Sequence, residues 1–249
     1  MKIFSSIIFI FGLVIVAGCC AHHDKVKTTT LNLFDSTRGR SVPISLYFGA
    51  DSNKSYKQIV IINNGYGVKN TEYTFISNKL AKLGYFVVSI QHDLPTDEPL
   101  ARTGDIFTLR KPVWERGVDN ISFVISELKS KYAYLNFNEL TLIGHSNGGD
   151  ISMLFCTKYP DLVSEVITLD HLRMPIPKVK QPQILSLRAT DTKPDNGVIP
   201  SDEEQKKYGI KIVKLKSGEH NDLCDFGNFE LKQSILDEVE KFINSKFST

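Results

Sequence analysis

The chain has 249 residues, a length that suffices for one large domain with a substantial buried core. Hydrophobic residues make up 41% and charged residues 23%, which are the proportions of an ordinary globular protein. The formal net charge is only +2 and no basic run stands out, so nucleic acid is not an expected partner.

The first residues have the features of an export signal. Met1-Lys2 is a short positive start, and an apolar run leads to Val16-Ala17-Gly18-Cys19. This ending resembles the lipobox of bacterial lipoproteins, in which a lipid is attached to the new N-terminal cysteine, although Val16 stands where leucine is usual. The resemblance predicts a signal peptide over residues 1–18, lipidation at Cys19, a polar tether over 19–27 and a folded domain over 28–249.

Such a chain would be an exported lipoprotein of the bacterial cell envelope, attached to a membrane through Cys19. The absence of Asp after Cys19 favours the outer membrane, on its periplasmic or surface face. An ordinary cleaved signal peptide and a retained anchor are the alternatives. Export also permits a disulfide between Cys156 and Cys224, but Cys156 falls on an expected helix, where a buried thiol is favoured.

Strands and helices are expected to alternate along the folded part. Residues 28–34 and 41–48 alternate apolar and polar side chains around a polar turn, which predicts an antiparallel hairpin. Further strands are expected at 58–62, 85–90, 140–143, 163–169, 183–189 and 210–215. Helices are expected at 70–83, at 112–129, after Gly148, from Ser201 and at 229–242. This alternation predicts an α/β fold with a mostly parallel twisted sheet and helices on both faces.

The candidate nucleophile is Ser146, in the sequence Gly144-His145-Ser146-Asn147-Gly148. A buried strand precedes this G-x-S-x-G pattern and a helix follows it, which is the context of a nucleophile elbow. The sharp turn places the serine in a strained conformation, so Gly144 and Gly148 are needed where side chains would clash.

A glycine-rich turn, Asn64-Gly65-Tyr66-Gly67, follows the strand at 58–62. Hydrolases with a nucleophile elbow place one oxyanion donor in the corresponding turn. The backbone N–H groups of Tyr66 and Asn147 are therefore the expected oxyanion hole. A plain tight turn without this role is the alternative.

His220 is the candidate general base, because it is the only histidine that follows both the serine and the candidate acids. Two aspartates are candidates for the acid that orients it. Asp191 follows the strand at 183–189 and is preferred, while Asp170, after the strand at 163–169, is an acceptable alternative.

Residues 27–242 resemble α/β-hydrolases of the dienelactone hydrolase and platelet-activating-factor acetylhydrolase type, and also the cutinase-like esterases. The likeness is carried by residues 64–67, 144–148, 169–175 and 218–220, with Ala189-Thr190-Asp191-Thr192 close to the cutinase-like enzymes. The acetylhydrolases imply Asp170 as the acid, and the other two groups imply Asp191. Two departures are Asn64, where histidine is usual, and a serine nucleophile in place of the cysteine of true dienelactone hydrolases.

The segment that links the strand at 163–169 to the strand at 183–189 is short and rich in proline, so no large lid is expected there. The loops 91–110 and 171–182 would form the walls of an open site. His171 and Arg173 are possible substrate-binding residues, with the alternative that Arg173 pairs with a surface acid. His92 and Asp93 would contact a substrate or hold their loop by local hydrogen bonds.

The sequence thus predicts a serine hydrolase that cleaves short-chain or accessible carboxylic esters, small-molecule substrates, through a Ser-His-Asp triad and an acyl-enzyme. A thioesterase or amidase with the same triad is one alternative, and an inactive hydrolase fold used as a surface binding protein is another. No metal or organic cofactor is expected, because no His/Cys spacing of a metal site appears and the chemistry needs none.

Overall fold

The computed structural model describes residues 25–50 and 56–245. The expected signal peptide, the lipidation site Cys19 and most of the tether lie outside the described residues. The described chain forms one sheet in the order β1-β2-β4-β3-β5-β6-β7-β8, in which β1, β2 and β4 pair antiparallel and all other neighbours are parallel.

The strands are β1 (Val26–Asp35), β2 (Arg40–Gly49), β3 (Ile59–Asn63), β4 (Phe86–Ile90), β5 (Leu140–His145), β6 (Val163–Leu169), β7 (Gln183–Arg188) and β8 (Lys211–Lys214). The α-helices are α1 (Thr74–Lys82), α2 (Ile106–Lys131), α3 (Asn147–Lys158), α4 (Asp202–Tyr208) and α5 (Phe229–Asn244). Two 3-10 turns, η1 (Pro160–Leu162) and η2 (His220–Asp222), complete the set. The predicted strand and helix order is confirmed.

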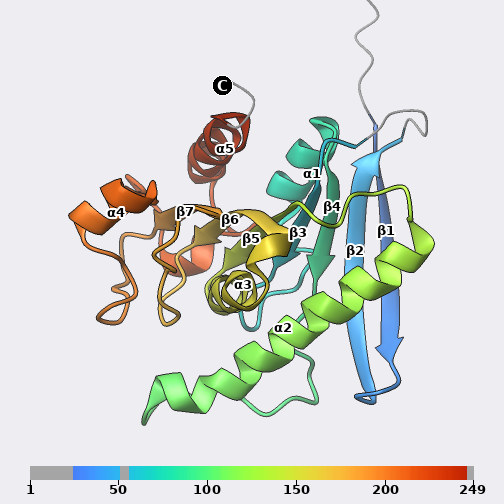
Figure 1. Cartoon of the computed structure of the whole chain (residues 1–249), viewed down its shortest axis with the longest axis horizontal. Helices are drawn as coiled ribbons and strands as arrows, with labels where there is room; N and C mark the ends of the chain where they lie inside the picture. The colour runs from blue at the N-terminus through green and yellow to red at the C-terminus, as the bar shows by residue number, and fades with distance from the viewer. Residues whose placement is uncertain (1–24, 51–55, 246–249) are drawn as a thin grey trace, which may run out of the picture.

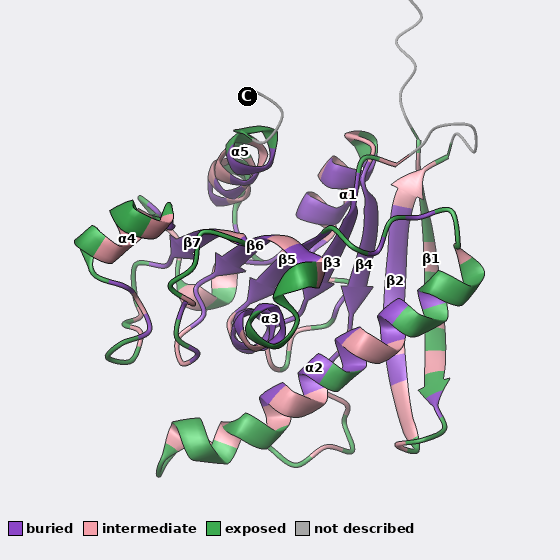
Figure 2. Ribbon diagram, in the orientation of Figure 1, coloured by how far each residue is buried: buried purple, intermediate pink, exposed green. Residues whose placement is uncertain are grey.

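Helices cover both faces of the sheet, with α1 and α5 on one side and α2 and α3 on the other (Figure 1). Successive side chains of a strand point to opposite faces of the sheet, so β3 contributes to two cores. Ile59 and Ile61 pack in the core under α2 and α3, while Val60 and Ile62 pack in the core under α1 and α5. The central strands are buried along their length (Figure 2). This two-sided burial explains their continuous apolar sequences.

Several element boundaries differ from the prediction by a few residues, and the starts of β1 and α2 are two of them. Strand β1 begins at Val26, so the last residues of the expected tether belong to the sheet. Helix α2 begins at Ile106 rather than at Pro112, because the Asp105 side chain accepts the Thr108 N–H and caps the helix earlier. Pro112 therefore lies inside the helix.

Cys156 and Cys224 are free thiols and both are buried. Burial raises the pKa of Cys156 to about 12, which is consistent with an inert core thiol. No described helix is long and apolar enough to cross a membrane.

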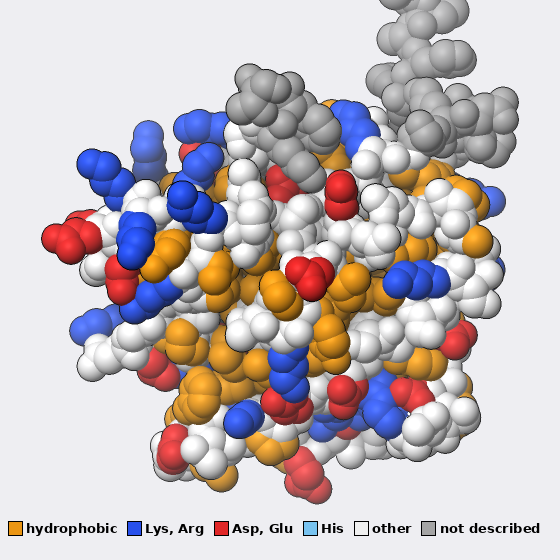
Figure 3. Space-filling view, viewed as in Figure 1, with side chains coloured by type: hydrophobic (Ala, Val, Ile, Leu, Met, Phe, Trp, Pro, Cys, Tyr) orange, Lys and Arg blue, Asp and Glu red, His pale blue; other side chains and the backbone are white. Residues whose placement is uncertain are grey.

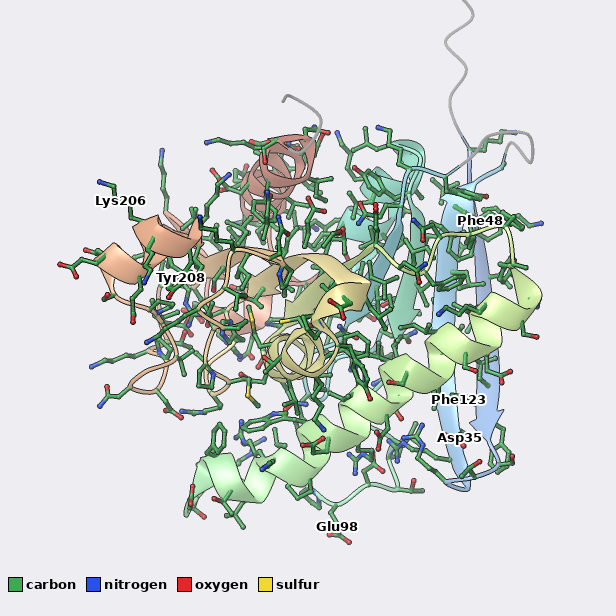
Figure 4. The ribbon with its side chains drawn as sticks, in the orientation of Figure 1. Asp35, Phe48, Glu98, Phe123, Lys206 and Tyr208 are labelled. Atoms are coloured by element: carbon green, nitrogen blue, oxygen red, sulfur yellow. The ribbon has the colours of Figure 1, made fainter. Side chains whose placement is uncertain are left out.

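The surface carries charges of both signs. On the face in Figure 3, basic and acidic side chains are interspersed around the rim, and hydrophobic side chains occupy much of the centre. Figure 4 places Asp35 near the turn of the β1–β2 hairpin and Phe48 toward the opposite end of β2. Asp35 accepts the Thr37 N–H, a bond that closes this hairpin turn.

Candidate active site

Ser146 stands at the sharp turn between β5 and α3. Its backbone has φ 51° and ψ −119°, a conformation that residues other than glycine rarely adopt. The turn is held because the Ser146 N–H donates to the Leu169 carbonyl at 2.9 Å. A Cβ on Gly148 would lie 2.2 Å from the Asn63 carbonyl oxygen, so glycine is needed there for close approach to β3. The predicted elbow geometry is present.

The Ser146 hydroxyl begins a continuous chain of hydrogen bonds. Ser146 Oγ lies 2.8 Å from His220 Nε2, and His220 Nδ1 lies 2.6 Å from Asp170 Oδ2. A carboxylate only accepts hydrogen bonds, so the geometry fits the Nδ1–H tautomer, in which Nε2 accepts the serine O–H. This is the tautomer that a general base requires.

Asp170 is buried and its carboxylate is held from several sides. It accepts bonds from the Thr192 hydroxyl at 2.5 Å and the Ala189 N–H at 3.1 Å, and Arg188 Nη2 lies 2.9 Å from Oδ1. Burial alone would raise the pKa of Asp170, but the hydrogen bond from His220 and the charge of Arg188 outweigh it and lower the pKa. The carboxylate therefore stays ionised in the interior.

Asp191, the preferred acid in the sequence analysis, does not contact the imidazole. Its Oδ1 accepts the backbone N–H of His220 at 2.7 Å. The expected contact with the ring is made instead by Asp170, the alternative acid. The reason is that Asp170 points inward from the end of β6 with φ 56°, whereas Asp191 lies beyond the end of β7 on an exposed turn.

The turn at residues 64–67 lies against the elbow, as predicted. Gly148 of the elbow approaches both Asn63 and Asn64, and Asp93 accepts the Gly67 N–H at 3.0 Å and a bond from the Asn64 side chain at 3.0 Å. Asp93 thus holds the turn, which is the structural alternative considered for it. Within the described residues, no hydrogen bond from the Tyr66 or Asn147 backbone N–H is found.

Three other predicted residues are occupied by internal contacts. His171 is fully buried with Nδ1 2.8 Å from Thr168 Oγ1, and burial lowers its pKa to about 3, so its side chain faces the interior and not an open site. Arg173 pairs with Asp195, as the structural alternative held. His92 is buried with Nε2 2.8 Å from Asn63 Oδ1, so it makes the internal hydrogen bonds given above as the alternative to substrate contact.

Several residues near the site were not identified from the sequence. Arg188 ends the buried strand β7. A single charged residue at the end of an apolar strand is the sequence signal that could have identified it. The Trp114 Nε1–H donates to Asn147 Oδ1 at 2.9 Å, with both side chains buried, so the tryptophan supports the elbow besides packing against the sheet. Tyr73 and His145 also contact each other here, at 2.9 Å.

No group of His, Cys, Asp and Glu side chains with the arrangement of a metal site occurs in residues 25–50 and 56–245. The chemistry available here is that of a serine beside a histidine and a buried carboxylate.

The family model described as "Dienelactone hydrolase family" matches residues 44–186, more than half of the chain. The chain belongs to this family. The matched range contains β3 to β6 with the elbow and Asp170, and it ends within β7. Membership makes the chain a hydrolase of an ester-cleaving type, and it confirms the resemblance read from the sequence.

No curated protein matches the chain. Among solved structures, a ferulic acid esterase from Streptomyces cinnamoneus is similar with a TM-score of 0.58 and 17% identity, over 83% of this chain and 78% of that one. The α/β-hydrolase MGS-M1 from a deep-sea metagenome library of the Medee basin is similar with a TM-score of 0.62 and 15% identity, over 89% and 98% of the two chains. At these identities the likeness establishes the α/β-hydrolase fold.

Proposed function

We propose that this dienelactone hydrolase family member is a serine esterase that cleaves carboxylic esters through an acyl-enzyme on Ser146. The observation that carries the proposal is the hydrogen-bond chain from Ser146 Oγ through His220 to Asp170, with distances of 2.8 and 2.6 Å. Nucleophile, base and orienting acid are thus within hydrogen-bond reach of one another.

Each residue has one role in this mechanism. Ser146 attacks the ester carbonyl while His220 Nε2 takes the hydroxyl proton, and the alcohol leaves with that proton. Asp170 holds the ring through Nδ1 and stabilises the imidazolium. Water then attacks the acyl-serine with the same histidine as base, and this second step releases the carboxylic acid and restores Ser146.

The backbone N–H groups of Tyr66 and Asn147 would stabilise the negative oxygen that forms on the carbonyl. Asn147 is the first residue of α3, so its N–H has no acceptor within the helix and lies at the positive end of the helix dipole. Each such donor is typically worth about 10²–10³ in rate.

The substrates are proposed to be short-chain or accessible esters. The segment from Asp170 to Pro182 contains no helix that could act as a lid, and Asp150 fixes its start by accepting the N–H groups of Arg173 and Met174. Hydrolysis of p-nitrophenyl esters of increasing acyl length tests this. We expect kcat/KM to fall with chain length, and a strong preference for long chains would contradict the proposal.

The central experiment uses a soluble protein that starts near Lys25. Wild type is expected to react with a fluorophosphonate and to hydrolyse p-nitrophenyl acetate, and Ser146→Ala is expected to lose both. A thioester and an amide of the same acyl group are tested beside the ester to rank the three kinds of bond by kcat/KM. A folded wild type that neither labels nor turns over any of the three would favour a binding role instead.

We also propose that the full chain is attached to the cell envelope by a lipid on Cys19. The sequence from Val16 to Cys19 supports this. Incorporation of labelled palmitate into the wild type but not into Cys19→Ser, together with membrane fractionation, tests the anchor. Equal labelling of both would disprove it.

A further inference from the structure

Tyr73 and His145 lie side by side beneath the candidate site, and the proposed mechanism uses neither. Tyr73 immediately precedes α1, and His145 ends β5 directly before Ser146. Both side chains are almost completely buried, with 1% and 2% of their surface exposed. Buried polar side chains need partners, and here the partners belong to the parts of the active site that must converge.

Three hydrogen bonds join these groups into one chain. The Gly65 N–H donates to Tyr73 Oη at 2.8 Å, Tyr73 Oη lies 2.9 Å from His145 Nδ1, and His145 Nε2 lies 2.8 Å from the His220 carbonyl oxygen. Gly65 precedes the proposed oxyanion donor Tyr66, and His145 precedes Ser146. The chain therefore connects the oxyanion turn, the elbow and the loop that carries the base.

The donor and the acceptor of each hydrogen bond follow from the groups at the two ends of this chain. A carbonyl oxygen can only accept, so His145 Nε2 must carry a proton and donate to His220. Burial lowers the pKa of His145 to about 4, so the imidazole is neutral at pH 7 and its Nδ1 is an acceptor. Tyr73 must then donate to Nδ1 while its oxygen accepts the Gly65 N–H. Every donor in the chain has one acceptor.

The same helix start holds the His220 loop at a second point. Asp225 accepts the Thr74 N–H at 2.8 Å and the Phe75 N–H at 3.1 Å, and the Asp225 N–H donates to the Glu72 carbonyl at 2.8 Å. Tyr73 thus sits in a segment that is fixed to the loop of residues 220–225 from two directions. Loops are the least rigid parts of a fold, so a base carried on one needs such support.

We propose that Tyr73 and His145 are positioning residues that set the backbone of His220 relative to Ser146 and to the oxyanion turn. The inference rests on the proposed esterase function for its kinetic consequence. Small displacements of a catalytic group reduce the chemical step more than they reduce binding, so the network is expected to act on kcat and much less on KM.

Tyr73→Phe is the first test, and Tyr85→Phe is its matched control. Both tyrosines are buried in the core under α1 and α5, but the Tyr85 hydroxyl has no hydrogen-bond partner among the described residues. We expect Tyr73→Phe to lower kcat by about tenfold with KM changed less than about twofold, and Tyr85→Phe to leave both within about twofold. Equal losses in the two variants would overturn the proposal.

His145→Gln and His145→Leu provide a second test that does not depend on the folding of Tyr73→Phe. Glutamine can still donate an N–H to the His220 carbonyl, whereas leucine fills the space without a donor. We expect His145→Gln to retain at least about fivefold more activity than His145→Leu. The proposal is wrong if the two variants are equally impaired.

Proton and nitrogen NMR of the histidine side chains provides a readout that needs no turnover. His145 is expected as the Nε2–H tautomer, and the His220 signals should shift in Tyr73→Phe but not in Tyr85→Phe. An Nδ1–H tautomer for His145, or unchanged His220 signals, would contradict the network. An inactive wild type would contradict the esterase proposal, but the NMR measurement would still test the network. The two failures are therefore distinguishable.

Discussion

Asp191 and His220 are joined through the backbone of the histidine, because Asp191 Oδ1 accepts the His220 N–H at 2.7 Å. The ring of the same histidine turns to Asp170, whose Oδ2 lies 2.6 Å from Nδ1. One aspartate therefore holds the loop and the other holds the imidazole. This division separates two carboxylates that are both candidates for the acid in the sequence.

Replacement of the two aspartates distinguishes their roles. Asp170→Asn is expected to lower kcat by roughly 10³–10⁴-fold, because an amide neither stabilises the imidazolium nor enforces the tautomer. Asp191→Asn keeps an oxygen for the His220 N–H and is expected to lose less than about tenfold. The measurement is p-nitrophenyl acetate hydrolysis by both variants. A larger loss in Asp191→Asn would return the role of the acid to that residue.

Arg188→Met tests the buried ion pair behind Asp170. Arg188 Nη2 lies 2.9 Å from Asp170 Oδ1, and the side chains are 9% and 0% exposed. Removal of the arginine leaves a buried carboxylate uncompensated, so the free energy of unfolding should fall by about 3–5 kcal/mol. Urea denaturation measures this change.

The matched control is Arg173→Met, since the side chains of Arg173 and its partner Asp195 are 24% and 44% exposed, well above those of the buried pair. Loss of an exposed pair is expected to cost no more than about 1 kcal/mol. A smaller loss for Arg188→Met than for the control would show that the Asp170 carboxylate does not need the arginine.

Asp150→Asn tests a pH dependence of stability. Asp150 is buried at the start of α3, and burial raises its pKa to about 6, despite the bonds from the Arg173 and Met174 N–H groups. A raised pKa in the folded state means that the stability contributed by protonation is complete below the unfolded value of 3.8 and is lost as the pH rises through about 6.

Asparagine stays neutral and still offers an oxygen to both N–H groups. The variant is therefore expected to be more stable than wild type at pH 8, on the order of 1 kcal/mol or more, and to lose that advantage at pH 4. Thermal unfolding of both proteins from pH 4 to pH 8 checks this. A stability difference that does not change with pH would mean that Asp150 is ionised throughout this range.

Trp114→Phe removes the donor to Asn147 Oδ1 and leaves a buried amide oxygen unsatisfied. We expect the free energy of unfolding to fall by about 1–3 kcal/mol, together with a lower kcat because Asn147 begins α3 beside Ser146. The double variant Trp114→Phe/Asn147→Leu leaves no unpaired group. Its loss of unfolding free energy should be smaller than the sum of the losses in the two single variants, and strict additivity would argue against the bond.

Local patterns in the sequence were sufficient for the fold and for most of the candidate site. Strands such as β3, buried on both faces, appear as continuous apolar runs, and the elbow is specified by glycines whose Cβ atoms would collide with backbone. Ser146 and His220 follow from the same local information, because a turn between strand and helix and a lone downstream histidine need no knowledge of distant contacts. Family membership agrees with that interpretation.

The choice of acid depended on the tertiary structure. Asp170 and Asp191 both follow parallel neighbouring strands, β6 and β7, so both arrive at the same edge of the sheet. What separates them is the positive φ of Asp170 and its inward direction, with Arg188 and Thr192 close enough to keep the carboxylate charged. None of these quantities is periodic or local in sequence.

The sequence by itself determined an α/β hydrolase with a serine at an elbow and a histidine after the last strand, since periodicity, glycine spacing and chain order are properties of neighbouring residues. Only the tertiary structure decided which carboxylate meets that histidine and how Tyr73 and His145 reach it, because those bonds join residues that are 50 to 75 positions apart. Contacts at such separations arise from the packing of helices on the sheet, and side-chain direction then selects among chemically equal candidates.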